Sequence, residues 1–370
     1  MTSKHSFGLA LLLLFFIPVL AQGDGVDDYI QAEMQKRQVP AVALAVIRDG
    51  EVIKQKAYGF ANVELNVPAT NDTVFQIASI TKTFTATAIM TLVQEGRISL
   101  DDRVRKILPS LPVAWSKVTV RHLLTHTSGL LDVSLDDDTG SVIANTRDEA
   151  LKKLSRLPLT SEPGAKWSYN ETGYVLLGMI IEKVSGLRFE DFMSQRFFRP
   201  LEMVQTRFGD SKQVIAGRAS IYTRYEHETD RKVSPYGLWT YQYFYPSYMY
   251  MGAGLNTSII DLAKWDIALS EGRILRSPTL NEMWRAVKLN NGAVFRFGSS
   301  TLGYGSGWMV DDHPGHKAVG HSGGDSTAYI HYLDDKLSVI VLTNCQGADP
   351  DSLVSGVAAL YIPALAQNEK

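Results

Sequence analysis

Strand-forming segments lie close to both ends of this 370-residue chain. Residues 41–47 and 52–58 are apolar, β-rich runs, and the Asp-Gly pair between them is a strong signal for a hairpin turn. Residues 329–333 and 337–343 flank a second hairpin near the other end. Helical patterns separated by loops dominate residues 99–300. The predicted α/β (α+β) architecture is therefore one antiparallel sheet built from both chain ends and flanked by helices, with an inserted, mainly helical domain.

These patterns divide the chain into a sheet domain of two segments, residues 22–98 and 301–370, and an inserted helical domain, residues 99–300. Helical periodicity or helix end signals predict helices over these segments: 26–38, Ser79 to near Gly96, 172–184, 261–271 and 349–365. The hydrophobic content of 45% is ordinary for a folded soluble protein. A formal net charge of -2 gives no indication of nucleic-acid binding.

The first 21 residues have the pattern of a secretory signal peptide. Lys4 supplies a positive charge, residues 9–20 are almost wholly apolar, and Val19-Leu20-Ala21 offers small residues for cleavage after Ala21. The alternative is an uncleaved anchor, which is less favoured because the apolar run is short for a membrane span. We therefore expect a secreted or periplasmic protein with no stable membrane span after cleavage.

Cysteine and histidine usage gives no indication of a cofactor. Cys345 is the single cysteine, so an intramolecular disulfide is excluded, and its position after an apolar run favours a structural thiol. His122 and His126 are four residues apart, but the intervening glutamate of a zinc-protease helix is missing. A structural role for both histidines is favoured over a metal site, and no cofactor or metal is expected.

The central chemical motif is Ser79-Ile80-Thr81-Lys82, which follows a turn signal and opens a helical pattern. Residues three apart share one face of a helix, so Lys82 can reach towards the Ser79 hydroxyl. A serine hydroxyl becomes a strong nucleophile when a neighbouring base takes its proton, and the helix N-terminus adds N–H groups for an oxyanion. The alternative is a capping serine followed by a solvated lysine, because Ser-x-x-Lys alone is a weak signal.

Two further stretches carry polar groups. Tyr169 precedes a helix, where it could act as a base if a cation such as Lys82 lowered its pKa, or could simply pack. Residues 319–325 match the Gly-x-Ser-x-Gly elbow of α/β-hydrolases around Ser322. That elbow requires a helix after the serine, whereas strand, turn and strand follow here, so we reject it. His321 is expected at the rim of a strand, beside glycines that allow a ligand close to the backbone.

Residues 236–250 are rich in tyrosine, tryptophan and phenylalanine, and proline and glycine residues flank this stretch. They could pack in the core or in a pair of strands. They could also form an aromatic wall beside a ligand cleft, which is the interpretation favoured here.

Together these stretches resemble the serine β-lactamase and penicillin-binding-protein family, and more closely its class C branch of β-lactamases, DD-carboxypeptidases, D-aminopeptidases and esterases. The likeness runs from about Val39 to Thr343. It implies a β-lactamase/transpeptidase-like fold, with Ser79 as the acylated nucleophile and Lys82 as the group that helps to deprotonate it. By the same resemblance, Tyr169 is the general base and acid.

The resemblance also implies a set of substrate-binding residues. The expected set is Asn170, Glu171, His321, Ser322, Gly323 and Gly324. His321-Ser322-Gly323 takes the place of Lys-Thr-Gly, or of the His-x-Gly found in some peptidases. These residue types suit binding of a substrate carboxylate or orientation of Tyr169. The backbone N–H groups of Ser79 and Gly324 are expected to form the oxyanion hole.

One position departs from the family pattern. The family has asparagine two places after the tyrosine, whereas this chain has Glu171. Either Asn170 takes over that role, or Glu171 places a negative charge near Lys82. A carboxylate there would hold Lys82 charged and repel a substrate carboxylate. We therefore predict stronger esterase than β-lactamase activity.

The sequence thus predicts a serine hydrolase that cleaves an ester or amide through an acyl-enzyme on Ser79. The expected partner is a small-molecule or peptide substrate: a D-amino-acid peptide, a small ester or a β-lactam. One alternative is a penicillin-binding sensor that is acylated without turnover. Another is a non-catalytic binding module that uses only the cleft.

Overall fold

A central eight-stranded sheet organises the computed structural model, which describes residues 25–134, 144–225 and 237–367. Its strand order is β3-β2-β1-β13-β12-β11-β10-β9, and every pair of neighbours for which a register is given is antiparallel. The strands are β1 (Ala41–Arg48), β2 (Glu51–Asn62), β3 (Val67–Pro68), β9 (Leu302–Tyr304), β10 (Met309–Asp311), β11 (Ala318–Gly323), β12 (Thr327–Tyr332) and β13 (Leu337–Thr343). The predicted antiparallel sheet built from both chain ends is confirmed, including both hairpins.

The two chain ends meet where β1 pairs with β13, in a register that joins Val42 to Thr343 and Arg48 to Leu337. Both strands are almost completely buried, so apolar residues are required on both of their faces. Alternate β1 residues enter two different cores: Ala43, Ala45 and Ile47 face one, and Val42, Leu44 and Val46 face the other. This double burial explains the unbroken apolar run in β1.

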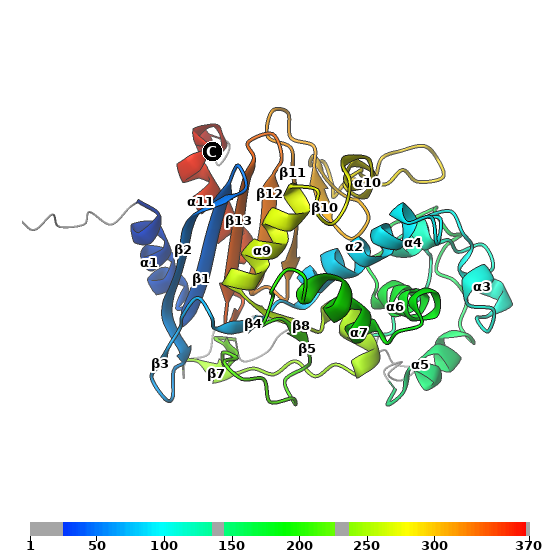
Figure 1. Cartoon of the computed structure of the whole chain (residues 1–370), viewed down its shortest axis with the longest axis horizontal. Helices are drawn as coiled ribbons and strands as arrows, with labels where there is room; N and C mark the ends of the chain where they lie inside the picture. The colour runs from blue at the N-terminus through cyan, green and yellow to red at the C-terminus, as the bar shows by residue number, and fades with distance from the viewer. Residues whose placement is uncertain (1–24, 135–143, 226–236, 368–370) are drawn as a thin grey trace, which may run out of the picture.

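Helices cover both faces of the sheet (Figure 1). The terminal helices α1 (Gly25–Arg37) and α11 (Pro350–Tyr361) share one face, where Ile30 packs in the same core as Val357. Helix α9 (Ile259–Ser270) crosses the opposite face over β1 and β13 (Figure 1). The predicted helices 26–38, 261–271 and 349–365 agree with these elements to within a few residues.

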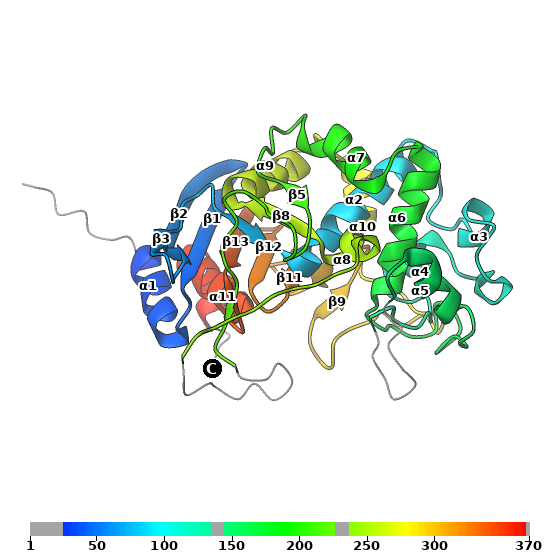
Figure 2. The same cartoon turned by 90° about the horizontal axis from the view of Figure 1, so that it is seen from below.

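The helical part lies beside the α9 face, around α2 (Thr81–Gln94) (Figures 1 and 2). The other helices there are α3 (Val104–Ile107), α4 (Val120–Leu124), α5 (Arg147–Leu154), α6 (Glu171–Ser185), α7 (Phe189–Met193), α8 (Tyr250–Ala253) and α10 (Ser277–Met283). Helix α6 confirms the segment predicted over 172–184, and it ends at Gly186 in the left-handed conformation, with φ +78°.

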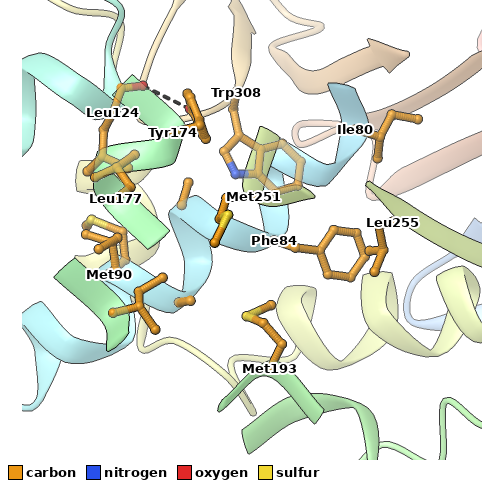
Figure 3. Packing of buried hydrophobic residues seen from close by; sticks show 14 of the residues in the cluster. Ile80, Phe84, Met90, Leu124, Tyr174, Leu177, Met193, Met251, Leu255 and Trp308 are labelled. Carbon is orange, nitrogen blue, oxygen red and sulfur yellow. Dashed lines mark hydrogen bonds between the residues drawn. The ribbon is translucent and has the colours of Figure 1, made fainter. Parts of the chain in front are cut away.

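Helix α2 is buried on all sides from Thr81 to Leu92. Phe84 stacks on Trp265 with ring centroids 4.1 Å apart, and Figure 3 shows Phe84 among the packed side chains of this core. The hydroxyls of Thr87 and Thr91 donate to carbonyl groups one turn earlier, which satisfies these polar groups inside the core. The helix is therefore a rigid base for the residues at its N-terminus.

Two small three-stranded sheets lie outside the central sheet. One has the order β4-β8-β5 and the other β14-β6-β7. Their strands are β4 (Val74–Gln76), β5 (Arg207–Phe208), β6 (Tyr222–Thr223), β7 (Trp239–Thr240), β8 (Leu255–Ser258) and β14 (Cys345–Gln346). Cys345 is buried, and burial raises the pKa of its thiol to about 11, consistent with a structural role.

The expected signal peptide, residues 1–21, lies outside the described residues. Within the described ranges, no helix has the length and apolar character needed to cross a membrane.

Candidate active site

Ser79 lies in a single 3₁₀ turn, η1 (Ala78–Ile80), between β4 and α2. The helix predicted to start at Ser79 therefore begins two residues later, at Thr81. Ala78 has φ +40°, a left-handed conformation that is costly for a residue with a Cβ atom. Ser79 itself is only half-buried, so a substrate can reach it.

The Lys82 ammonium has one acceptor for each of its three protons. Its Nζ lies 3.3 Å from Ser79 Oγ, 2.5 Å from Glu171 Oε1 and 3.0 Å from the carbonyl oxygen of Gly252. The side chain is fully buried. Three acceptors around a buried nitrogen suit the charged form, which donates three hydrogen bonds and accepts none. Burial alone lowers the pKa of Lys82, but Glu171 and Tyr169 outweigh burial and raise this pKa above its usual value.

Glu171 is the first residue of α6 and replaces the asparagine expected from the resemblance. Its Oε2 is buried and has no hydrogen-bond partner among the described residues. A Cβ atom added to Gly252 would lie 1.9 Å from this oxygen, so glycine at position 252 makes room for the carboxylate. Of the two sequence-based alternatives for this position, the geometry matches a negative charge beside Lys82.

Asn170 has a different set of contacts. Its Oδ1 accepts a hydrogen bond from the Gly173 N–H at 2.9 Å and caps α6. Its Nδ2 donates to the Leu130 carbonyl at 2.5 Å. The side chain is buried, and these bonds use it to fix the start of the helix that carries Glu171.

Tyr169 lies over the lysine. The Lys82 Nζ is 4.7 Å from the centroid of its ring, and the hydroxyl lies close enough to Ser79 and Lys82 for both to oppose the rise in its pKa that burial causes. Burial raises the pKa of Tyr169, and the opposing charge of Lys82 does not reverse that shift. The hydroxyl is therefore protonated at neutral pH. About 36% of the residue remains exposed, so it also borders the open side of the site.

His321 lies behind Tyr169 on β11 and is almost completely buried. Its Nδ1 is 2.7 Å from the Ser322 carbonyl and its Nε2 is 3.1 Å from the Tyr304 hydroxyl. Burial, reinforced by the charge of Lys82, lowers the pKa of His321 to about 3. The ring is therefore neutral near pH 7 and supplies no positive charge for a substrate carboxylate.

The same hydrogen-bonded chain continues to His126, which the sequence assigned only a structural role. The Tyr304 hydroxyl is 3.2 Å from His126 Nε2, and the Asn170 N–H donates to His126 Nδ1 at 3.2 Å. The His126 ring also packs on Tyr169, with centroids 4.4 Å apart. Sequence reasoning missed both His126 and Tyr304 as site residues, because neither belongs to a recognisable local motif.

The rest of the third stretch divides between two faces of β11. The Ser322 Oγ donates to Asp351 of α11 at 2.5 Å, on the opposite face from His321. Gly323 and Gly324 lie against the turn that carries Ser79. A Cβ atom on Gly323 would be 2.1 Å from the Ile77 carbonyl oxygen, and one on Gly324 would be 3.2 Å from the Ala78 Cβ. These glycines allow β11 to approach Ser79.

The aromatic residues 236–250 were expected either to pack in the core or to form a wall beside a cleft, and the structure shows both buried and exposed members. Tyr236 lies outside the described residues. Tyr248 and Tyr250 are buried, whereas Trp239 and Phe244 are exposed. The Tyr243 hydroxyl donates to the Gly324 carbonyl at 3.0 Å. The stretch therefore contributes both to packing and to a border beside Gly324.

No cluster of three or more histidine, cysteine, aspartate or glutamate side chains suited to a metal ion occurs in the described ranges. His122 instead caps the start of α4 with Thr119.

Comparison with known proteins gives consistent matches. The family model described as Beta-lactamase matches residues 26–360. Penicillin-binding protein 4* of Bacillus subtilis (strain 168) is 32% identical over 322 residues, which cover 84% of this chain and 69% of that protein.

Solved structures give the same result. The octameric penicillin-binding protein homologue from Pyrococcus abyssi is 31% identical, with a TM-score of 0.75 over 91% of this chain and 77% of that one. The D-amino acid amidase from Ochrobactrum anthropi SV3, complexed with L-phenylalanine amide, is 28% identical, with a TM-score of 0.74 over 92% of this chain and 99% of that one.

Proposed function

Because this chain belongs to the beta-lactamase family, we propose that it is a serine hydrolase that cleaves an ester or amide through an acyl-enzyme on Ser79. The observation that carries the proposal is the position of the Lys82 Nζ. It lies 3.3 Å from Ser79 Oγ and is paired at 2.5 Å with a carboxylate that can take a proton. A nucleophile, a base and a third group that orients the base are thereby within reach of one another.

In the proposed acylation step, Lys82 transfers one proton to Glu171 Oε1 and accepts the proton of Ser79. The Ser79 oxygen then forms a bond to the substrate carbonyl carbon, whose π electrons move onto the carbonyl oxygen. Glu171 becomes neutral, Lys82 is again an ammonium, and the negative charge has moved to the oxyanion. The backbone N–H groups of Ser79 and Gly324 are the proposed oxyanion donors.

Tyr169 acts next as the general acid. Its protonated hydroxyl gives a proton to the leaving alkoxide or amine as the tetrahedral intermediate collapses. The phenolate that remains is stabilised by the Lys82 ammonium and regains a proton from Glu171 through Lys82. Water repeats the sequence in deacylation, releases the acid and restores Ser79.

The preferred substrate class follows from charge. His321 is neutral where many family members carry a lysine, and Glu171 adds a carboxylate to the site. An acyl group without a carboxylate is therefore favoured, as in a short-chain ester or a D-amino acid amide. The amidase from Ochrobactrum anthropi SV3 is a structural relative whose name fits the second substrate. A β-lactam carboxylate is disfavoured by like-charge repulsion.

A penicillin-binding sensor is the second candidate, because a penicillin-binding protein is among the relatives. Such a protein would be acylated once by a penicillin without turnover. A non-catalytic binding module is less favoured, because Lys82 lies within reach of Ser79 and a proton-accepting carboxylate.

Secretion remains a proposal of its own, supported by the sequence of residues 1–21. The mature chain then begins near Gln22. N-terminal sequencing of protein made by its native host tests this proposal, and an intact Met1 on cytoplasmic protein would reject it.

Turnover on purified mature protein tests the enzyme proposal. We expect steady release of p-nitrophenol from short-chain esters or of ammonia from D-amino acid amides, at rates above those for a chromogenic cephalosporin. One-time labelling by penicillin with no turnover of any substrate would favour the sensor. Faster hydrolysis of the cephalosporin than of both other classes would contradict the proposed substrate preference.

A further inference from the structure

A second cavity lies on the α9 face of the sheet, and none of its lining residues belongs to the candidate active site. Its volume is about 380 Å³, within the usual range for small-molecule sites. The turn between β1 and β2, the end of α9, the end of α10 and strands β12 and β13 contribute its walls. Ile47, Trp284 and Leu333 form its apolar part.

Asp266 lies in the wall of this cavity and is only 1% exposed. All of the hydrogen bonds to its carboxylate converge on one oxygen. Oδ1 accepts from the Tyr329 hydroxyl at 2.6 Å and the Ser338 hydroxyl at 2.8 Å, and it lies 3.3 Å from His331 Nδ1. Oδ2 is buried and has no hydrogen-bond partner among the described residues. A buried carboxylate oxygen without a partner is costly, so a donor in the cavity would be bound favourably.

The two carboxylates at the rim of the cavity are each paired with a cationic side chain. Asp49 and Glu271 line the rim, where Lys336 lies 3.7 Å from Asp49 and Arg273 lies 2.8 Å from Glu271. Glu271 approaches the β1–β2 turn, where a Cβ atom on Gly50 would lie 3.4 Å from its Oε1. Asp266 is therefore the cavity carboxylate without a lysine or arginine partner among the described residues, and its charge favours a cationic ligand over an anionic one.

Trp284 provides an aromatic surface and a buried donor without a partner among the described residues. Its indole Nε1 is buried without a hydrogen-bond partner in the part of the chain that the structure describes. The centroid of its ring lies 6.1 Å from the centroid of the His331 ring. An aromatic ring beside a buried carboxylate is a combination that binds organic cations through charge and cation–π contact.

We propose that this cavity is a binding site for a small primary ammonium compound with an apolar body. The ammonium group donates to Asp266 Oδ2, and the apolar body lies against Ile47, Trp284 and Leu333. A metal ion does not fit these residues, because the described ranges contain no cluster of three or more metal-ligating side chains. The site is independent of the hydrolase proposal.

Calorimetric titration with benzylamine at pH 7.5 tests the site, with benzyl alcohol as the uncharged comparison. We expect saturable binding of benzylamine and at least about tenfold weaker binding of benzyl alcohol, as for loss of a hydrogen bond to a charged group. Asp266→Asn keeps the shape and the acceptor for Tyr329 and Ser338 but removes the charge, so it should also weaken benzylamine binding about tenfold.

Two controls separate this site from other carboxylates. Asp28→Asn, at an exposed residue of α1, and Glu171→Asn, in the candidate active site, should both leave benzylamine affinity unchanged. If Asp266→Asn does not unfold cooperatively, Glu271→Gln at the exposed rim replaces it, with an expected weakening of about threefold. Equal affinity for benzylamine and benzyl alcohol, no benzylamine binding, or undiminished affinity in the folded cavity variant would overturn the proposal.

Discussion

Glu171 supplies the negative charge beside Lys82 and the candidate nucleophile, Ser79. Glu171 holds Lys82 as a charged partner at 2.5 Å, whereas an asparagine would leave this lysine without a counterion. We expect Glu171→Asn to lower ester turnover by roughly a hundredfold, the usual contribution of a proton-transfer group. The same change removes the charge that repels a β-lactam carboxylate, so the ratio of cephalosporin to ester turnover should rise.

Steady-state kinetics on both substrates measure this ratio. Asp28→Asn is a matched control, because it removes a carboxylate from the distant surface of α1. An unchanged ratio in Glu171→Asn would show that Glu171 does not determine substrate preference.

The buried histidines link the site to acid stability. Burial lowers the pKa of His321 to about 3, whereas its ordinary value is 6.5, and burial also lowers the pKa of His126. The unfolded chain therefore binds more protons than the folded chain below about pH 6.5. The stability that these two neutral histidines contribute should be fully present above that pH and should be lost as the pH decreases towards 3.

Replacement of His321 should remove its share of this pH dependence. The free energy of unfolding should decrease between pH 7 and pH 4 in both proteins. This decrease should be larger in the wild-type protein than in His321→Asn, by up to about 3 kcal/mol. Urea unfolding at both pH values measures the difference. Equal losses in the two proteins would mean that His321 is not held neutral by the fold.

The sequence could predict the residues that belong to local motifs, but not those that the fold brings to the site. Ser79 and Lys82 are three residues apart and recognisable together, and the geometry brings Tyr169 and Glu171 to them. Tyr304 and His126 are 178 residues apart and meet only after β9 and α4 have packed. Their spacing along the chain contains no information about that contact.

At the scale of elements, the close contact between β11 and η1 positions Ser79. Gly323 in β11 approaches the Ile77 carbonyl so closely that an added Cβ atom would lie 2.1 Å away. Gly323→Ala should push η1 from the strand, lower kcat/KM at least about tenfold and destabilise the fold by about 1–3 kcal/mol. Gly25→Ala, where an added Cβ meets nothing within 4 Å, is the steric control. An undiminished kcat/KM in folded Gly323→Ala would show that this contact does not position the nucleophile.

Elements with strong local signals were predictable, and short elements were not. The turn between β1 and β2 has φ +51° at Asp49 and +81° at Gly50, the left-handed pair that an Asp-Gly hairpin requires. In contrast, β9 and β10 contain three residues each and carry too few side chains for a periodic pattern. The 3₁₀ turn at Ser79 was also missed, because its left-handed Ala78 depends on tertiary packing.

At the scale of the whole molecule, the fold class was predictable because the two hairpins lie at opposite chain ends. The pairing of β1 with β13 rather than β12 was not, since both strands of the second hairpin are apolar. The structure shows the physical difference: β13 is buried at all seven positions, whereas Ile330 and His331 of β12 are only partly buried. The family resemblance, stated from three motifs, is confirmed by the match over residues 26–360.

The most direct test of the central proposal is the mass and position of a covalent adduct on the intact protein. After incubation with a fluorophosphonate or penicillin, peptide mapping should place a single adduct on Ser79. Ser79→Ala should abolish the adduct and reduce turnover by about a thousandfold or more. Ser322→Ala should label normally, because that hydroxyl donates to Asp351 on the opposite face of β11. An adduct on Ser322, or unchanged labelling of Ser79→Ala, would contradict the assignment of Ser79 as the nucleophile.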